Sequence, residues 1–572
     1  MRFGARRGDE SSRIELEPLE PRRFLSGTAL LTAGDVDKIL ADAASQAGPK
    51  EVITVVGREG EILGIFARDK ARLGPVADQA DHLGTADSIL LGTLTESVAR
   101  ARTAADFGSS GEAFTTRTAR FIVQNHFPPD LQNTPGGPLY GVEFSSLPGS
   151  DVTPSAALSG DPGGVPLYID GQPVGGIGVA GEGDGVLAAP GLPYPNGTHP
   201  KLYNGVEEYS FDEAVALAGE SGFAPPSSIT ANNIFVGGLR LPYVAENAVS
   251  SKPRLSLSSL LDENAGYLVL ADSHITGLPL ETNTTLGLAS RTSSAIISEP
   301  PTAYPSATFA GNTGTLKNTN PKATDFGIVR GVGSEGEHLS VKDVNTIITD
   351  AVAQALVTRA GIREPLGTNA VVHVAVTDTE GNILGVFAMN DATDFSYDVA
   401  VQKARTAAFF SSNIAAISTT AVGFVSQTYF PPGIEDASSG PLYELQNVLS
   451  LDAPPEAPIQ NGITIFPGGI PLYKNGVLVG AVGVSGDGVN QDDLIAYAGT
   501  SGFRPAAAIE ADSLSNQTLV NVFESKLDIL TGDYTAYPDV ESIIAKSKQR
   551  IKDDLDIRLP FVKFPRDPLT GG

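Results

Sequence analysis

Apolar positions along the chain change from helical to strand spacing in the same order twice. In the first half, Val36 and Ile39 belong to a segment of helical periodicity, and two β-rich runs around an Arg-Glu-Gly turn follow within 51–67. The same order returns in the second half, with helical spacing over 339–356 and two β-rich runs over 371–389. We therefore predict a helix followed by a β-hairpin in each half.

A second hairpin is predicted within Phe466–Asp493, which reads FPGGIPLYKNGVLVGAVGVSGDGVNQDD. Asn475-Gly476 favours a tight hairpin turn, because both central residues of such a turn adopt positive φ. The glycine-rich corner that follows predicts a helix running to about Gly499. Asp492 or Asn490 is the expected cap of that helix.

This glycine-rich stretch occurs twice. Residues 162–181 and 467–486 are identical at 12 of 20 aligned positions. Gly480 and Gly483 interrupt the β-branched return strand, which indicates that something approaches the backbone closely there. We infer that the chain contains a duplication.

Two further pairs of segments support the duplication. Ser97–Tyr140 matches Ala400–Tyr443 without gaps, and both stretches begin with an alanine-rich helical block. Each half also closes with a related segment, LRLPYV at 239–244 and IRLPFV at 557–562, for which we expect a strand.

The predicted organisation has four parts. They are a disordered N-terminal segment (1–27), a first domain (28–245), a linker rich in Ser, Thr and Pro (246–335) and a second domain (336–572). Because so long a linker without structure is unusual, we expect strands from about Tyr267 to Ile275 that pack on one of the domains.

Composition narrows the class of partners. The net charge of −27 argues against nucleic acid and anionic membrane surfaces, since both select basic patches. The chain has no cysteine, which excludes disulfides, zinc–thiolate sites, iron–sulfur clusters and thiol catalysis. No run of about 18 apolar residues is present, so we expect no membrane span.

The N-terminal segment carries one recognisable motif. Leu16–Ser26, reading LEPLEPRRFLS, resembles the short LEPR-type motif of large exported or surface proteins of planctomycete-like bacteria. The resemblance implies a secreted or cell-surface protein; the alternative is a plain disordered tail.

Three blocks of the second half resemble the GlcG/HbpS family of haem-binding proteins, which includes the PduO C-terminal domain. They are QKARTAAFFSS (402–412), PGGIPLYKNGVLVGAVGVSG (467–486) and GVNQDDLIAYAG (488–499). The resemblance implies an α+β fold of two tandem profilin-like domains, each an antiparallel sheet flanked by helices. It also implies self-association and haem, or a related tetrapyrrole, as ligand. The first half departs from the pattern of these blocks, with Arg100 in place of Lys403 and an insertion before Asp212.

Six residues are candidates for holding the ligand. His126 and its counterpart Tyr429 are possible axial ligands of haem iron, and the alternative is that both pack against a Pro-Pro turn. Thr103 and Thr406 lie on the helix whose family counterpart lines the ligand site, with helix packing as the alternative. Lys403 and Arg405 are candidate partners for haem propionates, unless they lie on a solvated helix face. The full set is His126, Tyr429, Thr103, Thr406, Lys403 and Arg405.

The favoured hypothesis is a haem-binding protein of the cell surface or exterior, for sensing, storage or protection. A non-catalytic structural or interaction module at the cell surface is the first alternative. An enzyme that acts on a small molecule or degrades haem is the second, and only paired acids such as Asp492 and Asp493 favour it. Adjacent residues on a helix do not face one site, so a non-enzyme is preferred.

Overall fold

The computed structural model describes most of the chain. The described residues are 29–68, 85–123, 127, 137–142, 158–181, 210–245, 253–262, 265–269, 289–290, 296–299, 304–317, 327–334, 336–431, 434, 437–448, 458–535, 538–556 and 558–562. We call the part up to residue 299 the first half and the part from residue 304 the second half. The expected disordered segment 1–27 and its LEPR-type motif lie outside the described residues.

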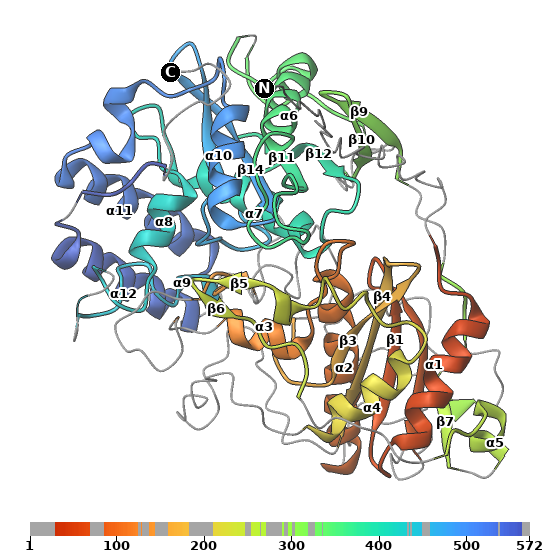
Figure 1. Ribbon diagram of the computed structural model, residues 1–572. Coiled ribbons are helices and arrows are strands. Elements are labelled where there is room, and N and C mark those ends of the chain that lie inside the picture. Colours follow the sequence, from red (N-terminus) through yellow and green to blue (C-terminus); the bar gives the residue numbers. More distant parts are fainter. Residues whose placement is uncertain are drawn as a thin grey trace, which may run out of the picture.

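Two six-stranded antiparallel sheets of the same type form the scaffold, one in each half (Figure 1). The first sheet has the order β3-β4-β1-β2-β7-β8, and the second has the order β13-β14-β11-β12-β10-β9. The first-half strands are β1 (Val52–Gly57), β2 (Ile62–Arg68), β3 (Gly164–Ile169), β4 (Gln172–Ala180), β7 (Gly266–Val269) and β8 (Ala289–Ser290), beside a separate pair β5 (Phe235–Val236) and β6 (Leu239–Arg240). The second-half strands are β9 (Ser306–Phe309), β10 (Asn312–Leu316), β11 (Val372–Thr377), β12 (Ile383–Met389), β13 (Gly469–Lys474) and β14 (Val477–Gly486).

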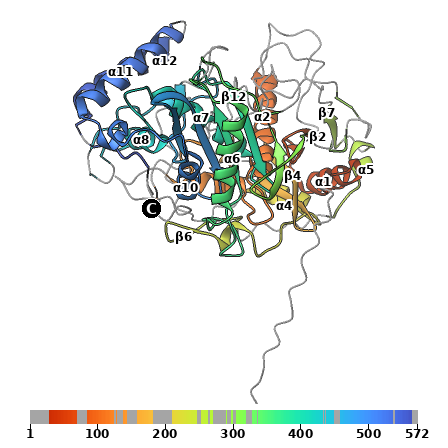
Figure 2. The ribbon, with the colours of Figure 1, turned by 90° about the horizontal axis from the view of Figure 1, so that it is seen from above.

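Helices cover both faces of each sheet. In the first half α2 packs on one face and α1 with α4 on the other, while in the second half α7 packs on one face and α6 with α10 on the other (Figures 1 and 2). The first-half helices are α1 (Ala33–Gln46), α2 (Thr85–Asp106), α3 (Thr116–Ile122), α4 (Phe211–Glu220) and α5 (Leu257–Asp262). The second-half helices are α6 (Val341–Ala355), α7 (Phe395–Phe410), α8 (Thr419–Val425), α9 (Leu445–Val448), α10 (Val489–Gly499), α11 (Asn516–Asp533) and α12 (Pro538–Asp554). The prediction of an α+β protein with antiparallel sheets and flanking helices is confirmed.

The glycines of the return strands let a helix lie directly on the sheet, where the sequence predicted only that something approaches the backbone closely. A Cβ atom on Gly483 would lie 2.0 Å from the backbone oxygen of Ala400 in α7. The first half has the same approach, since a Cβ on Gly178 would lie 2.1 Å from the oxygen of Ser97 in α2. Any side chain here would push the helix away from the strand that it covers.

Segments that we expected to be linker extend both sheets. β7 pairs with β2 in the first sheet, and β10 pairs with β12 in the second. β7 includes Tyr267, where the sequence predicted strands to begin. The closing segments are different from the prediction, because only Leu239–Arg240 forms a strand and the described residues 558–562 form none. Among the helices that the structure describes, none is both long and apolar enough to cross a lipid bilayer.

Candidate functional site

The two halves meet where the C-terminal end of α2 faces the N-terminal end of α7. Phe107 follows α2 directly and stacks on Phe395, the first residue of α7, with ring centroids 4.4 Å apart. Such a stack adds about 0.5–1.5 kcal/mol to the free energy of burying the two rings. Apolar side chains of both halves continue the contact as one buried cluster that includes Phe114, Phe121, Ile122, Leu241, Val399 and Phe466. The ends of two helices are therefore joined by a core that belongs to neither half alone.

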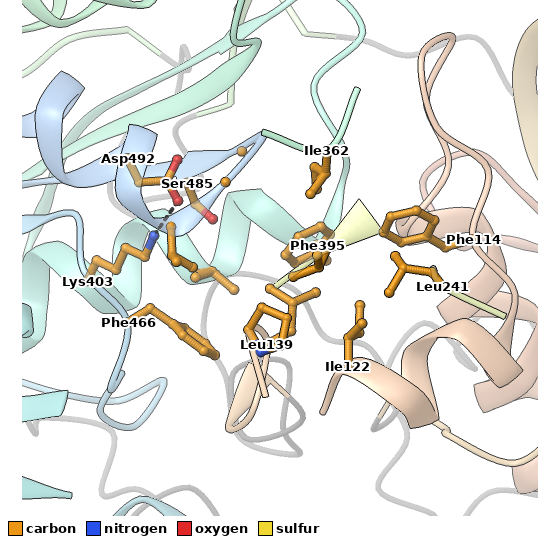
Figure 3. A pocket seen from close by; sticks show the side chains of 16 residues that line it. Phe114, Ile122, Leu139, Leu241, Ile362, Phe395, Lys403, Phe466, Ser485 and Asp492 are labelled. Atoms are coloured by element: carbon orange, nitrogen blue, oxygen red, sulfur yellow. Dashed lines mark hydrogen bonds and ion pairs between the residues drawn. The ribbon is translucent and has the colours of Figure 1, made fainter. Parts of the chain in front are cut away.

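A pocket lies inside this contact, and both halves line it (Figure 3). The lining is mostly apolar and includes Phe114, Ile122, Leu139 and Leu241 from the first half, and Ile362, Phe395 and Phe466 from the second. The polar side chains of the lining are Lys403, Ser485 and Asp492, all from the second half. The free space is about 40 Å³, which is room for about three water molecules.

Lys403 and Asp492 form a buried ion pair in the wall of this pocket. Lys403 Nζ lies 2.8 Å from Asp492 Oδ2 and donates a hydrogen bond of 2.7 Å to the backbone oxygen of Val484. Burial lowers the pKa of Lys403, although Asp492 opposes the shift. Burial also raises the pKa of Asp492 to about 6, against the effect of Lys403. A buried lysine with a perturbed pKa beside a pocket is a candidate functional group.

The first half contains the same arrangement around Arg100. Arg100 Nη1 lies 2.7 Å from Asp212 Oδ2 and also donates a hydrogen bond to the backbone oxygen of Val179. Arg100 precedes Lys403 by 303 positions, at the spacing of the sequence match. A residue of the other half makes the same two bonds, so these bonds belong to the shared fold. In each half the cation ties its helix to the return strand through a backbone oxygen and to the following helix through the ion pair.

The surroundings of the two pairs are different. Beside Lys403, Val399 and Phe466 present apolar surface. At the corresponding positions the first half has Glu96 and Asp161, and Glu96 forms an ion pair with Arg100. The second half therefore has an apolar surface where the first half is charged, and the pocket lies on that apolar surface.

Two buried polar networks flank the pocket and also join the halves. In one, Arg363 lies 2.6 Å from both Asp391 and Asp487 and 3.9 Å from Glu112 of the first half. Burial, followed by the charge of Asp487, raises the pKa of Glu112 well above its usual range. The backbone amide of Ser110 donates to Asp391 at 2.7 Å, which adds a second contact across the boundary.

The other network lies at the turn between β1 and β2. Lys317 of the second half pairs with Asp394 at 2.6 Å and with Glu59 of the first half at 3.1 Å. Asp106 lies nearby at the end of α2, and burial, followed by the charge of Asp394, raises its pKa to about 7. Arg58 spans the boundary by donating to the backbone oxygen of Ala392 at 3.2 Å.

Comparison with known proteins places the second half. Residues 340–501 match the family model described as haem degrading protein HbpS-like. An uncharacterized 15.0 kDa protein of Citrobacter freundii, from a dhaT-dhaS intergenic region, is 36% identical over 145 residues, which are 25% of this chain and 81% of that protein. The chain belongs to the HbpS-like family. Similar solved structures are Klebsiella pneumoniae ORFY (26% identity, 28% of this chain and 86% of that one, TM-score 0.21) and a PduOC–haem complex (26% identity, 30% and 97%, TM-score 0.22).

The HbpS-like region contains one wall of the pocket. It begins at Ser340, the cap of α6, and ends two residues after α10. Lys403, Asp492 and the apolar residues around them therefore lie within it. The first half and the α11–α12 pair lie outside it.

The two candidate threonines are buried and bonded to the backbone. Thr103 Oγ1 donates to the oxygen of Ala99 and accepts a hydrogen bond of 2.7 Å from the amide of Ser159. Thr406 accepts the corresponding bond from the amide of Thr464 at 3.0 Å. Both hydroxyls thus tie the helix to the segment before the second hairpin, and neither residue lines the pocket.

The remaining candidates lie in three different places. Lys403 lines the pocket, whereas buried Arg405 donates to the oxygens of Gly381 and Asn461, away from the lining. Tyr429 is half-buried after α8 and is not a lining residue. His126 lies outside the described residues.

Asp492 is the residue that sequence reasoning assigned wrongly. We expected it, or Asn490, to cap α10, but the helix begins after Gly488 without a side-chain cap. Asp492 instead pairs with Lys403, 89 positions earlier. The available signal was the pair of matched positions, because Arg100 and Asp212 in the first half have the same opposite charges.

Proposed function

We propose that the HbpS-like half binds haem or a related tetrapyrrole on the apolar surface formed by Phe395, Val399 and Phe466. The observation that carries the proposal is that this surface, with one lysine beside it, lies inside the region that matches a family described by haem. Flat aromatic side chains suit the face of a macrocycle, and Lys403 is a suitable partner for its carboxylates.

The pocket is too small for such a ligand. Its 40 Å³ is far below the space of pockets that hold drug-sized molecules, about 300–1,000 Å³. Because both halves line the pocket, a tetrapyrrole fits only when α3 and its neighbours move away from α7. The proposal therefore includes an open state in which the first half uncovers the apolar surface.

The lining also limits how the ligand is held. Iron in haem is usually held by His, Met, Cys or Tyr, and none of these is among the described residues that line the pocket. We therefore expect the macrocycle and its carboxylates, rather than the iron, to supply most of the binding free energy. Tyr429 as an axial ligand remains a separate prediction.

The test is a titration of the full chain with hemin and, separately, with metal-free protoporphyrin, followed by absorbance and by quenching of protein fluorescence. Saturable binding of both with dissociation constants within about tenfold is expected, since the iron contributes little. Binding of hemin alone that is lost in Tyr429→Phe would show that an axial ligand to the iron, rather than the apolar surface, holds the compound. Absence of saturable binding of either compound would reject the proposal.

A matched pair of variants locates the site. Val399→Glu introduces the charge that the first half has at this position and is expected to weaken tetrapyrrole binding by about tenfold or more. Glu96→Val makes the reverse change in the first half and should leave binding unchanged. Equal effects of the two substitutions would show that the ligand does not contact the second-half surface.

A non-catalytic structural or interaction module is the second candidate function. It is supported by the bonds of Thr103, Thr406 and Arg405 to the backbone, because these bonds stabilise the fold and occupy polar groups that we expected to hold a ligand. This function predicts that neither tetrapyrrole changes the melting temperature of the chain. A rise in melting temperature that saturates with ligand would contradict it.

We also propose that the two halves arose by duplication and that the chain acts at the cell surface or exterior. The equal strand orders and the corresponding bonds of Arg100 and Lys403 support the first proposal. An experimental structure with 162–181 and 467–486 in unlike surroundings would reject it. The motif at Leu16–Ser26 supports the second, and recovery of the protein only from the cell interior after fractionation would reject it.

A further inference from the structure

The second half has a face that corresponds to the one by which the first half contacts it. Phe107 and Ile122 of the first half lie in the contact with α7, and their counterparts 303 positions later are Phe410 and Val425. Phe107 stacks on Phe395 across the boundary. Phe410 packs instead on Phe523 of α11, with ring centroids 5.6 Å apart.

The same backbone bonds frame both faces. Ala113 forms a parallel bridge with Thr230, and its counterpart Ala416 forms one with Glu510. Later in each half, a backbone oxygen accepts a hydrogen bond from the hydroxyl that caps the helix after the bridge. Thr115 Oγ1 donates to the oxygen of Tyr243 in the first half, and Ser418 Oγ donates to the oxygen of Phe561 in the second.

The chain between these anchor points differs greatly in length. Ala231 and Leu241 are 10 positions apart, and the short β5–β6 turn fills the interval. The corresponding Ala511 and Leu559 are 48 positions apart, and the interval contains α11 and α12. In the first half this connection touches the second half, because Val236 and Leu241 line the pocket. In the second half the connection has become a helical hairpin.

The helical hairpin buries the corresponding face. Phe523, Leu527 and Leu530 of α11 and Ile544 of α12 are fully buried in one core with Phe410, Val425 and Leu442. Lys526 Nζ lies 5.4 Å from the ring centroid of Phe409. Figures 1 and 2 both show α11 beside α8, and α12 contacts α9.

In the described part of the first half, the positions that correspond to the receiving surface of the second half do not form an apolar surface. The surface that receives the first half is formed by Phe395, Val399 and Phe466. The first half has Glu96 and Asp161 at the positions that correspond to the last two. A face of the same kind as the docking face would therefore meet charge rather than apolar side chains there.

We propose that the α11–α12 hairpin is a built-in cap that covers a second docking face, and that without it this face binds a second copy of the chain. The apolar receiving surface is already occupied by the first half of the same molecule. The uncovered face is therefore left to pair with its equal on another copy, which gives a two-fold dimer.

The test replaces residues 515–558 in the full chain by the first-half connection 235–240. Although the family resemblance implies self-association, the cap covers the second docking face of the unaltered chain. Sedimentation velocity over a range of protein concentrations is therefore expected to give the monomer mass for the unaltered chain and twice the mass for the variant. A variant that stays monomeric would reject the second docking face. Open-ended polymers would reject the face-to-face pairing.

A milder variant keeps the proposal testable where the replacement fails to fold. Phe523→Ala loosens the cap, and amide hydrogen exchange should rise by at least tenfold in 416–425 while 113–122 stays unchanged. The matched variant Phe107→Ala should produce the reverse, with faster exchange in 113–122 and at the start of α7. Faster exchange at both faces in either variant would show that the cap and the docking contact are not separate units.

Discussion

The two buried ion pairs, Lys403–Asp492 and Arg100–Asp212, have the same bonds and different neighbours. Each cation holds its helix to the oxygen of the return strand and to an acid of the following helix. Lys403 has Val399 beside it, whereas Arg100 has Glu96. The shared bonds are therefore part of the fold, and the neighbours decide which half presents apolar surface. Substitutions at these positions can separate the contribution of the shared bonds from that of the neighbouring residues.

Removing the acid of each pair should have the largest effect. Asp492→Ala leaves Lys403 buried without its counter-ion and is expected to lower the free energy of unfolding by about 3–5 kcal/mol. Asp212→Ala should lower it by much less, because Arg100 keeps Glu96 as a partner. Urea unfolding of the two variants measures both losses.

A control for this comparison removes both charges. Lys403→Met with Asp492→Leu replaces the pair by apolar groups and should cost less than Asp492→Ala alone, because no buried charge stays unpaired. Equal losses in Asp492→Ala and Asp212→Ala would contradict the role that we assign to Glu96.

The half-buried acid at the boundary, Asp106, should make stability depend on pH. Burial raises the pKa of Asp106 from 3.8 to about 7, so the folded state holds its proton more tightly than the unfolded state. The resulting stabilisation is complete below pH 3.8 and is lost as the pH rises to about 7, by up to about 1.4 kcal/mol per pH unit. Asp106→Asn should flatten this part of the stability profile, as measured by thermal unfolding.

The neighbouring groups set the pH range of this loss, and a second acid adds to it. Arg58 and Arg102 lower the pKa of Asp106, whereas Asp394 raises it. Glu59 titrates in the same range, since burial followed by the charge of Asp394 raises its pKa to about 7. Glu59→Gln is the matched control and should flatten the profile independently. Unaltered slopes in both variants would place the pH dependence elsewhere.

Converting the lysine to the first-half residue should have a moderate effect. Lys403→Arg adds volume in a tight site, because a Cβ atom added to Gly468 would lie only 3.1 Å from Lys403 Nζ. We therefore expect the free energy of unfolding to fall by about 1–3 kcal/mol. Adding Val399→Glu supplies the partner that Arg100 has and should recover part of the loss. A double variant less stable than Lys403→Arg, by urea unfolding, would contradict the comparison.

Local patterns in the sequence were sufficient for the helices, the hairpins and the close approach to the glycines of the return strand. Gly480 and Gly483 indicated a close approach because glycine weakens the interior of a strand unless another backbone packs against it, and Gly483 is indeed next to the oxygen of Ala400. Thr32 caps α1 by accepting from the amide of Asp35, and threonine just before a helical run is a local signal for the start of a helix. These features depend on residues that are close in the sequence or that belong to one helix or one strand.

The site depends on contacts that no local pattern encodes. Asp492 fits the rules for a helix cap as well as it fits an ion pair, and only the tertiary position of Lys403 decides between them. Glu112 and Arg363 come from different halves, so the network that they share follows from how the halves pack. The burial of Phe395 against Phe107 has the same origin.

The smallest predicted effect concerns a surface pair that only one half has. Lys474 Nζ lies 2.8 Å from Asp343 Oδ2, and the position corresponding to Lys474 in the first half is Ile169. Although burial opposes it, bonds from Lys474 and Ser340 lower the pKa of Asp343 below its usual value. Because the pair is partly exposed, Lys474→Ile should cost only about 0.2–1 kcal/mol. Thermal unfolding at low and high salt measures this loss, which should shrink as salt screens the pair. A larger loss that salt does not change would mean that Lys474 supports the sheet edge by packing rather than by charge.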